Sequence, residues 1–340
     1  MLNTTRSCLL EGVSAASSRL YMTSTSYITL VYHIPTSLWS AAVNFIVLWL
    51  VGKTRGLQSP SNLLLCSLTL NDFLVGVVAQ PLAITRTLLR MLADNFCTET
   101  QVDIARSFAI HFYRSIALTT LVLISIDRYV AVTRLIGYKL LVTKLRVIKA
   151  VTVAWLVNII QTSVITFLLS GSSKLLTKSV FFAVLAGFVF CIQVAVAVQV
   201  YTFKFNASSQ IEVERRVIST VVIILAVLFV SYIPMIIVMA TESITGNSYM
   251  KYSSQWLEAI LFMNSMVNPI IFIKRNSLLC DAAKAFANYA FCLKRSQSNS
   301  TVRTPVPGNS CPCLSYLGRK QRQVTPLNAS FVLPEANATL

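Results

Sequence analysis

The sequence predicts an all-α membrane protein, a bundle of seven transmembrane helices followed by a short amphipathic eighth helix. The first observation is composition, because 55% of the 340 residues are hydrophobic and only 12% are charged, unlike a soluble domain. The second is patterning. A bilayer core about 30 Å thick requires roughly 20 apolar residues per helix, and the chain supplies seven such stretches.

Short polar connections separate the seven apolar stretches, so the predicted bundle occupies residues 28–274. It follows an extracellular N-terminal segment over residues 1–27, and the second outer loop is expected over residues 170–179. The predicted spans are residues 29–51, 63–88, 104–132, 147–169, 180–203, 217–240 and 257–273.

The segment after the seventh span has apolar residues at helical spacing around Asp281 and Lys284. This pattern predicts a helix on the membrane surface within residues 275–293, in contact with membrane lipids. Residues 294–340 are rich in Ser, Thr and Pro and are expected to form a disordered cytoplasmic tail.

The net charge of +17 raises the question of a nucleic-acid partner. The bases lie mainly between and after the apolar spans, where the positive-inside rule relates them to membrane topology instead. We therefore expect a multi-pass protein of the plasma membrane with an extracellular N-terminus and no nucleic acid bound. Lys174 and Lys178 are exceptions, because both fall in the expected second outer loop.

Modification sites follow from this topology. Asn3 lies in an Asn-Thr-Thr sequon on the outer side and is the predicted glycosylation site. Cys8 and Cys97 are the two cysteines expected outside, so at most one outer disulfide can form. Cys292, at the end of the membrane-surface helix, is a candidate for palmitoylation, and an unmodified cytosolic cysteine is the alternative.

Six charged residues fall inside the spans, where a charge normally faces the bundle interior and finds a partner. Asp127 and Arg128 close the third span at its inner end. Glu214 lies 20 residues before Pro234, about 30 Å along a helix, and so also belongs at the inner end. An acid and a base at two inner helix ends can form a clasp, or both can be ordinary solvated charges. The six are Asp72, Arg106, Arg114, Asp127, Arg128 and Glu258.

The motif Asp127-Arg128-Tyr129 resembles the signature of rhodopsin-like, class A G-protein-coupled receptors, and other landmarks of that family follow in order over residues 28–292. Single motifs are weak, but one landmark in each span makes a specific signal. The other landmarks are Asn44, Asp72, Trp155, Tyr201, Pro234, Asn268 and Pro269.

The resemblance implies a switch. In such receptors the arginine that matches Arg128 is held by acids that match Asp127 and Glu214, and it is released towards a heterotrimeric G protein when the sixth helix swings outward. A ligand would bias this two-state bundle, and no reaction would be catalysed, so the protein is not expected to be an enzyme. Tail hydroxyls around Ser296 and Ser298 could be phosphorylated to recruit arrestin.

Several positions depart from the family pattern. Tyr232 replaces the usual tryptophan before Pro234 and brings a hydroxyl that needs a partner. Phe272 replaces the tyrosine of the Asn-Pro-x-x-Tyr element. Ala117 replaces a serine that in the family offers an oxygen to an allosteric sodium ion, the one cofactor that the resemblance implies. The remaining candidate sodium ligands are Asp72, Asn264, Ser265 and Asn268.

A weaker resemblance points to the melanocortin branch. Asp103 stands where the family has its outer cysteine, the second outer loop is short and lacks cysteine, and Gln193 stands in place of the fifth-span proline. The likeness ends at the ligand site, because Leu82 and Ser107 replace two ligand-binding acids of that branch. A melanocortin peptide is therefore not expected.

The ligand class is narrowed by exclusion. Ile110 stands where amine receptors place an aspartate, Met239 where adenosine receptors place an asparagine, and Phe262 where opsins place the retinal lysine. We expect a small ligand or a short peptide, because only about 27 residues precede the first span.

Arg114 lies 14 residues before Arg128, about 21 Å along the third span, with His111 one turn further out. Glu258 should lie at a comparable depth. The hypothesis is that Arg114 and Glu258 flank the ligand cavity, where they pair with each other or contact an anionic or zwitterionic ligand. The alternative is a purely structural pair. The candidate cavity residues are Asp103, Ser107, His111, Arg114 and Glu258.

Three rival interpretations remain open. A transporter or channel could use Asp72, Arg114 and Glu258 as a polar pathway, but it predicts broken helices or repeated halves that the sequence does not display. An embedded enzyme would need clustered catalytic or metal-ligating side chains, and the chain has only two histidines. A receptor-like protein that does not signal is the third.

Overall fold

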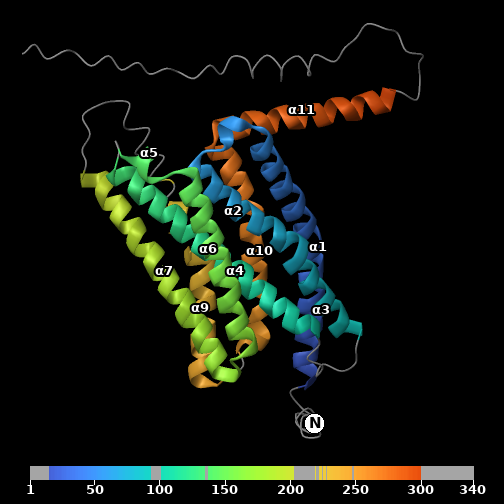
Figure 1. Ribbon diagram of the computed structural model, residues 1–340. Helices are drawn as coiled ribbons and strands as arrows, with labels where there is room; N and C mark the ends of the chain where they lie inside the picture. Colours follow the sequence, from blue (N-terminus) through green and yellow to red (C-terminus); the bar gives the residue numbers. More distant parts are fainter. Residues whose placement is uncertain are drawn as a thin grey trace, which may run out of the picture. The chain divides into compact units, whose positions relative to one another are not determined.

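The computed structural model forms a bundle of long helices that lie side by side (Figure 1). Within the described residues, six helices are long and apolar enough to cross a membrane, and Phe229–Thr245 is a shorter apolar helix. The predicted seven-helix membrane bundle is thereby confirmed. The structure describes residues 15–92, 101–134, 137–202, 219, 222–223, 225–226, 228–246 and 249–299.

The helices follow the order of the predicted spans. The second span is continuous, because α2, η2 and α3 succeed one another without a break, and the described end of the sixth span consists of η3 and α9. The elements are α1 (Ala15–Lys53), η1 (Arg55–Leu57), α2 (Pro60–Leu74), η2 (Val75–Ala79), α3 (Gln80–Leu92), α4 (Gln101–Thr133), α5 (Tyr138–Leu141), α6 (Lys144–Phe167), α7 (Gly171–Thr202), η3 (Leu228–Tyr232), α9 (Ile233–Thr245), α10 (Tyr249–Arg275) and α11 (Ser277–Asn299).

Local sequence signals explain where several helices begin and end. The Ser59 hydroxyl caps α2 by accepting from the Asn62 amide, and Pro60 follows at the first helical position, where no amide hydrogen is needed. Thr143 caps α6 in the same way. Gly246 ends α9 with φ of 71°, a left-handed conformation that glycine adopts at low cost.

Two wide π-type turns interrupt the spans, and each lies just before a proline. The segment η2 precedes Pro81, and η3 precedes Pro234. Proline lacks an amide hydrogen and crowds the preceding turn, so a widened turn relieves the clash. At η2 the backbone also touches α1, because a Cβ added at Gly76 would lie 2.7 Å from the backbone nitrogen of Ala41.

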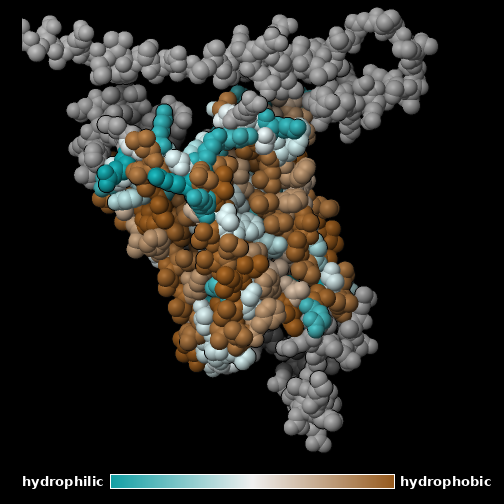
Figure 2. Space-filling view, viewed as in Figure 1, coloured by the Kyte–Doolittle hydropathy of each residue, from teal (hydrophilic) through white to brown (hydrophobic). Residues whose placement is uncertain are grey.

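The surface of the bundle is apolar along its length, and hydrophilic residues gather at the end that carries α5 (Figure 2). Exposed Lys139, Lys144, Arg146 and Lys149 belong to α5 and the start of α6. We call this the Arg128 end and the opposite one the Arg106 end, after two residues of α4. The distribution is that of a multi-pass membrane protein, whose lipid-facing side chains are apolar.

The interior holds polar side chains that join the spans. The Asn44 amide donates to the Ser265 carbonyl at 3.0 Å, which links α1 to α10. The Trp155 indole donates to the Ser67 hydroxyl at 3.2 Å, which links α6 to α2. Polar bonds of this kind replace the water that a membrane interior lacks. They fix the helices that carry the candidate site.

Some predicted boundaries were wrong. The helix α7 begins at Gly171, so residues 170–179 are not a loop and the connection from α6 is residues 168–170. The helix α1 begins at Ala15, within the predicted N-terminal segment, while its apolar part, Ser26–Lys53, agrees with the predicted first span. The helix α11 continues to Asn299, past residue 293.

Several predictions fall on residues that the structure does not describe. These are Asn3, Cys8, Cys97, Glu214 and residues 300–340, and the side chains of Tyr201 and Cys292 are likewise outside the description. The start of α11 is described, because the Asn276 side chain accepts from the Leu279 amide at 3.3 Å and caps the helix.

Candidate functional site

Asp127 and Arg128 form an ion pair at the Arg128 end of α4. Arg128 donates to Asp127 Oδ2 through Nη2 at 2.5 Å and through Nε at 3.1 Å. Asp127 is buried, whereas the Arg128 side chain keeps 31% of its surface exposed. The next residue, Tyr129, is exposed. The arginine is therefore held by its neighbour but is accessible from this end of the bundle.

Sequence reasoning missed two further partners of this carboxylate. The Tyr138 hydroxyl in α5 donates to Asp127 Oδ1 at 2.7 Å, and the Ser61 hydroxyl in α2 donates to Oδ2 at 3.1 Å. Burial raises the pKa of Tyr138 above its usual value, and the hydrogen bond to Asp127 acts in the same direction. The tyrosine therefore remains a donor at neutral pH. The signal that could have found it is the one tyrosine in the connection over residues 134–143.

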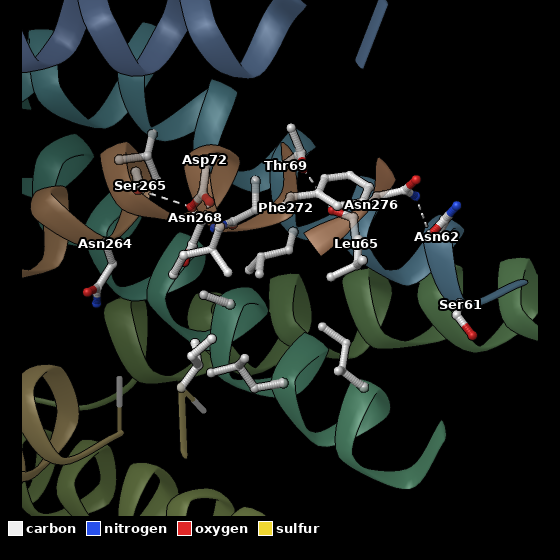
Figure 3. Close-up of a pocket in the computed structure, with 18 of the residues that line it drawn as sticks. Ser61, Asn62, Leu65, Thr69, Asp72, Asn264, Ser265, Asn268, Phe272 and Asn276 are labelled. Atoms are coloured by element: carbon white, nitrogen blue, oxygen red, sulfur yellow. Dashed lines mark hydrogen bonds between the residues drawn. The ribbon is translucent and has the colours of Figure 1, made fainter. Parts of the chain in front are cut away.

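Asp72 is the buried acid of α2, and two side chains of α10 bind it. The Ser265 hydroxyl donates to Oδ1 at 3.0 Å, and the Asn268 amide donates to Oδ2 at 2.8 Å (Figure 3). Asn264 donates instead to the Ser231 hydroxyl. Figure 3 shows Asn264 apart from the carboxylate, so three of the four candidate sodium ligands gather and the fourth does not.

A cavity of about 440 Å³ connects Asp72 with the Asp127–Arg128 pair. Its walls include Tyr232 and Phe272, the two aromatic residues that depart from the family pattern. Figure 3 shows Asp72 near one end and Ser61 near the other, with aliphatic side chains between them. The cavity thus joins the two polar groups that the sequence predicted as separate features.

The chemistry around Asp72 suits a small hard cation. No ion pair among the described residues includes this carboxylate, which is only 2% exposed. A buried carboxylate without a cationic side chain carries an uncompensated charge when ionised. Carboxylate, hydroxyl and amide oxygens are the ligands that hard cations prefer. The described residues contain no group of three His, Cys, Asp or Glu side chains that could hold a transition metal.

At the Arg106 end, the expected pair of Arg114 with Glu258 does not form. Glu258 accepts a hydrogen bond from Arg106, one of the intramembrane charges that sequence reasoning left without a partner. Asp103 pairs with Arg86 of α3, and its carboxylate also lies 4.0 Å from Arg106 Nε. Arg106 lies two turns further from Arg128 than Arg114 does, which places it beside Glu258 of α10.

Arg114 instead lies in an apolar part of the core. Its guanidinium contacts the Met235 sulfur of α9, and its backbone carbonyl accepts from the Tyr232 hydroxyl at 3.2 Å. This bond supplies the partner that the tyrosine hydroxyl was predicted to need. His111, one turn away, shares a hydrogen bond with Gln161 of α6 at 3.2 Å and stacks edge-on against Phe182.

Ser107 is half-buried on the same helix as Asp103, His111 and Arg114. The structure therefore brings Asp103 and Glu258 to one ion-pair network through Arg106. It places His111 and Arg114 deeper, between α4, α7 and α9. The expected cavity residues therefore divide into these two groups.

Gln193 stands where the family has its fifth-span proline. Its side-chain amide donates to the Ser125 hydroxyl at 2.7 Å, which joins α7 to α4.

Residues 43–272, more than half of the chain, match the family described as 7 transmembrane receptor (rhodopsin family). The chain is 30% identical to melanopsin of Branchiostoma belcheri over 118 residues, which are 34% of this chain and 16% of melanopsin. It is 33% identical to adenosine receptor A2b of Canis lupus familiaris over 116 residues, 34% of this chain and 33% of that receptor. It is 25% identical to trace amine-associated receptor 7f of Mus musculus over 271 residues, 67% of this chain and 73% of that receptor.

Proposed function

Because the chain belongs to the rhodopsin family of seven-transmembrane receptors, we propose that it is a receptor for a small ligand or a short peptide that activates heterotrimeric G proteins. Membership confirms the resemblance carried by Asp127-Arg128-Tyr129. The observation that supports the activity best is the hold on Arg128, which is bound by Asp127 and yet accessible at one end of the bundle.

We infer that the Arg128 end faces the cytoplasm of a plasma-membrane receptor whose N-terminus is extracellular. The exposed bases of α5 and α6 lie at this end and support that orientation. Asn3 would then be glycosylated outside. A Cys8–Cys97 disulfide would also lie outside, while Cys292 would carry a palmitoyl group at the inner lipid surface.

The proposed mechanism is a change of conformation and catalyses no reaction. In the quiet state Asp127 holds Arg128 and is itself held by α2 and α5 through Ser61 and Tyr138. Glu214 is the proposed second restraint from the sixth span. When ligand favours the state in which the sixth span moves outward at the Arg128 end, the cavity beside Arg128 widens to accept the G protein.

The sixth span is suited to such a motion. The wide turn η3 precedes Pro234, and an interrupted hydrogen-bond ladder bends more easily than a regular helix. Tyr232 lies in that turn, donates to the carbonyl of Arg114 in α4 and also lines the cavity. A shift of α9 would therefore break one defined contact with α4.

A sodium ion is proposed at Asp72, held with Ser265 and Asn268. The ion would supply the positive charge that no described side chain gives this carboxylate. Arrestin is proposed as a second partner after phosphorylation of the tail around Ser296 and Ser298. The proposed ligand is neither retinal, adenosine nor an amine, because Phe262, Met239 and Ile110 stand where receptors for those ligands place their anchoring residues.

The family match favours a receptor over a transporter or channel. The experiment is G-protein heterotrimer dissociation in cells, measured across the Gα classes at matched surface expression. We expect Glu214→Ala to raise the basal signal and Arg128→Ala to abolish it. Equal basal signals from the unmodified chain and Arg128→Ala in every class would contradict the proposal.

A further inference from the structure

The charges at the Arg106 end do not balance. Three acids of the described residues lie at this end, and two of them, Asp103 and Glu258, are each bound by an arginine; the third is Glu242 of α9. Arg114 and Lys178 remain, with only 5% and 7% of their surfaces exposed, and neither forms an ion pair within the described part of the chain. A buried cation without an anion is costly, because it loses its hydration and gains no partner.

These two bases belong to one region. Lys178 lies one turn before Phe182 on α7, and Arg114 lies one turn after His111 on α4. The rings of His111 and Phe182 pack against each other with centroids 5.2 Å apart, so the two bases lie near one contact between α4 and α7. Both cations are buried there without an ion pair among the described residues, because Glu258 is bound to Arg106.

Unsatisfied polar atoms mark the same place. Within the described residues Arg114 Nε and His111 Nδ1 are buried and have no hydrogen-bond partner. Among the described residues, the Met235 sulfur is the one hydrogen-bond partner of the Arg114 guanidinium, and it is a weak acceptor for a charged donor. A guanidinium is built to bind a carboxylate or a phosphate through two parallel hydrogen bonds, and here that capacity is unused.

The surroundings of these bases are apolar and adaptable. Phe182 has no exposed surface and packs against both His111 and Tyr232, with ring centroids 5.2 and 6.2 Å away. Met235 and Met239 of α9 are buried beside them. Methionine side chains repack at low cost to admit a ligand, and an aromatic and thioether wall suits an apolar body.

We propose that Arg114 and Lys178 form an anion-binding site, which takes an organic acid whose carboxylate or phosphate lies between them. The apolar body of this acid rests on Phe182, Met235 and Met239. The inference deepens the proposed function. A signal from the bound anion depends on that function, whereas the binding itself does not. The sequence predicted Lys178 in the second outer loop, residues 170–179. In the structure α7 already begins at Gly171, so Lys178 belongs to this helix and is buried.

Thermal unfolding of the full chain, purified in dodecyl maltoside, tests the site. The probes are dodecanoate, dodecyl phosphate and the uncharged dodecanol, which share one chain and differ in the head. We expect at least one anion to raise Tm by several degrees more than the alcohol does, because a ligand bound to the folded state stabilises it. The two anions distinguish a carboxylate site from a phosphate site. Equal effects of all three probes would overturn the proposal.

Variants locate the effect. Arg114→Gln and Lys178→Gln should each lower the anion-dependent Tm shift to that of dodecanol, while the ligand-free Tm stays equal or rises, since an unpaired buried charge is removed. The matched control is Lys174→Gln, one turn away on α7, whose ammonium already donates to the Thr166 carbonyl at 3.1 Å. It should retain the shift.

An anion shift that persists in both Arg114→Gln and Lys178→Gln would overturn the site. If Arg114→Gln fails to fold, the anion-dependent Tm shift of Lys178→Gln, compared with that of Lys174→Gln, tests the site alone. Binding is measured without G protein, so the two proposals fail separately. Anion binding without any G-protein response would support this site and contradict the proposed function. A G-protein response without anion binding would support the proposed function and contradict this site.

Discussion

The hydroxyl of Tyr138 donates a hydrogen bond of 2.7 Å to the carboxylate of Asp127. The same carboxylate holds Arg128 through its other oxygen, so the short helix α5 and the switch arginine share one acid. The position of α5 is therefore linked to the state of Arg128, and any change in one should be measurable in the other.

Tyr138→Phe removes this hydrogen bond and leaves the ring in place. We expect faster amide hydrogen exchange over residues 137–142, because the anchor of α5 is lost, and a Tm lower by about 1–2 °C for a bond worth about 1 kcal/mol. Tyr129→Phe is the control, since Tyr129 is exposed on the same helix as Arg128. Unchanged exchange in Tyr138→Phe would show that the bond does not hold α5.

The protonation of Tyr138 gives a pH prediction. Burial raises its pKa above the usual 10.0, so the folded protein holds this proton more tightly than the unfolded chain. The contribution to stability is complete below pH 10 and is lost as pH rises through the folded value. Exchange over residues 137–142, corrected for its intrinsic pH dependence, should therefore be constant from pH 6 to 8. A loss of protection within that window would contradict the assignment.

Glu258→Gln removes the hydrogen-bonded partner of the buried Arg106 and leaves it the longer contact of 4.0 Å with Asp103. We expect a loss of up to about 3–5 kcal/mol of stability, because a buried charge that is only partly compensated is costly. The double variant Arg106→Gln with Glu258→Gln should recover much of it, and a double-mutant cycle should give a coupling of about 1–3 kcal/mol. The cycle of Arg114 with Glu258 is the contrast and should give less than half that coupling.

Asp72→Asn tests the proposed sodium ion. Replacing potassium chloride by sodium chloride should raise Tm of the unmodified chain, because the ion would bind only the folded state. Asp72→Asn should abolish this difference. Asn264→Ala should keep most of it, since Asn264 is bonded to Ser231 and not to the carboxylate. Equal Tm in the two salts for the unmodified chain would remove the sodium proposal.

Gln193→Leu and Ser125→Ala test the bond that joins α7 to α4. Ser125→Ala should lose about 1–2 kcal/mol of stability, because the Gln193 amide is left buried without this acceptor. Gln193→Leu should lose less, because the Ser125 hydroxyl still donates to the Leu121 carbonyl at 2.7 Å. The double variant should cost less than the sum of the two single losses. Fully additive losses, measured by thermal unfolding, would show that the 2.7 Å contact contributes nothing of its own.

The sequence predicted the parts of the fold that depend on apolar runs and on motifs within one helix. Seven spans, the pairing of Asp127 with its neighbour Arg128, and the burial of Asp72 all follow from residues close together in the chain. Ser265 and Asn268 lie three residues apart on α10, so one face of that helix could be assigned to Asp72.

Pairings between different helices were harder to predict. Arg114 and Glu258 were matched by depth along their helices, but depth leaves the rotation of each helix undetermined, and Arg106 takes the acid. Lys178 was misplaced because a lysine after a short polar stretch reads as loop, whereas the helix begins at Gly171. Tyr138 lies in a connection, where periodicity carries no information about contacts.

The connection of three residues between α6 and α7 acts as a tether. Residues 168–170 can reach about 10 Å when fully extended, close to the 8–10 Å that separates packed helix axes. The adjoining ends of α6 and α7 can therefore neither drift apart nor slide far past one another. A motion that opens this end of the bundle must therefore move α6 and α7 together or displace other helices, such as α3, α9 or α10.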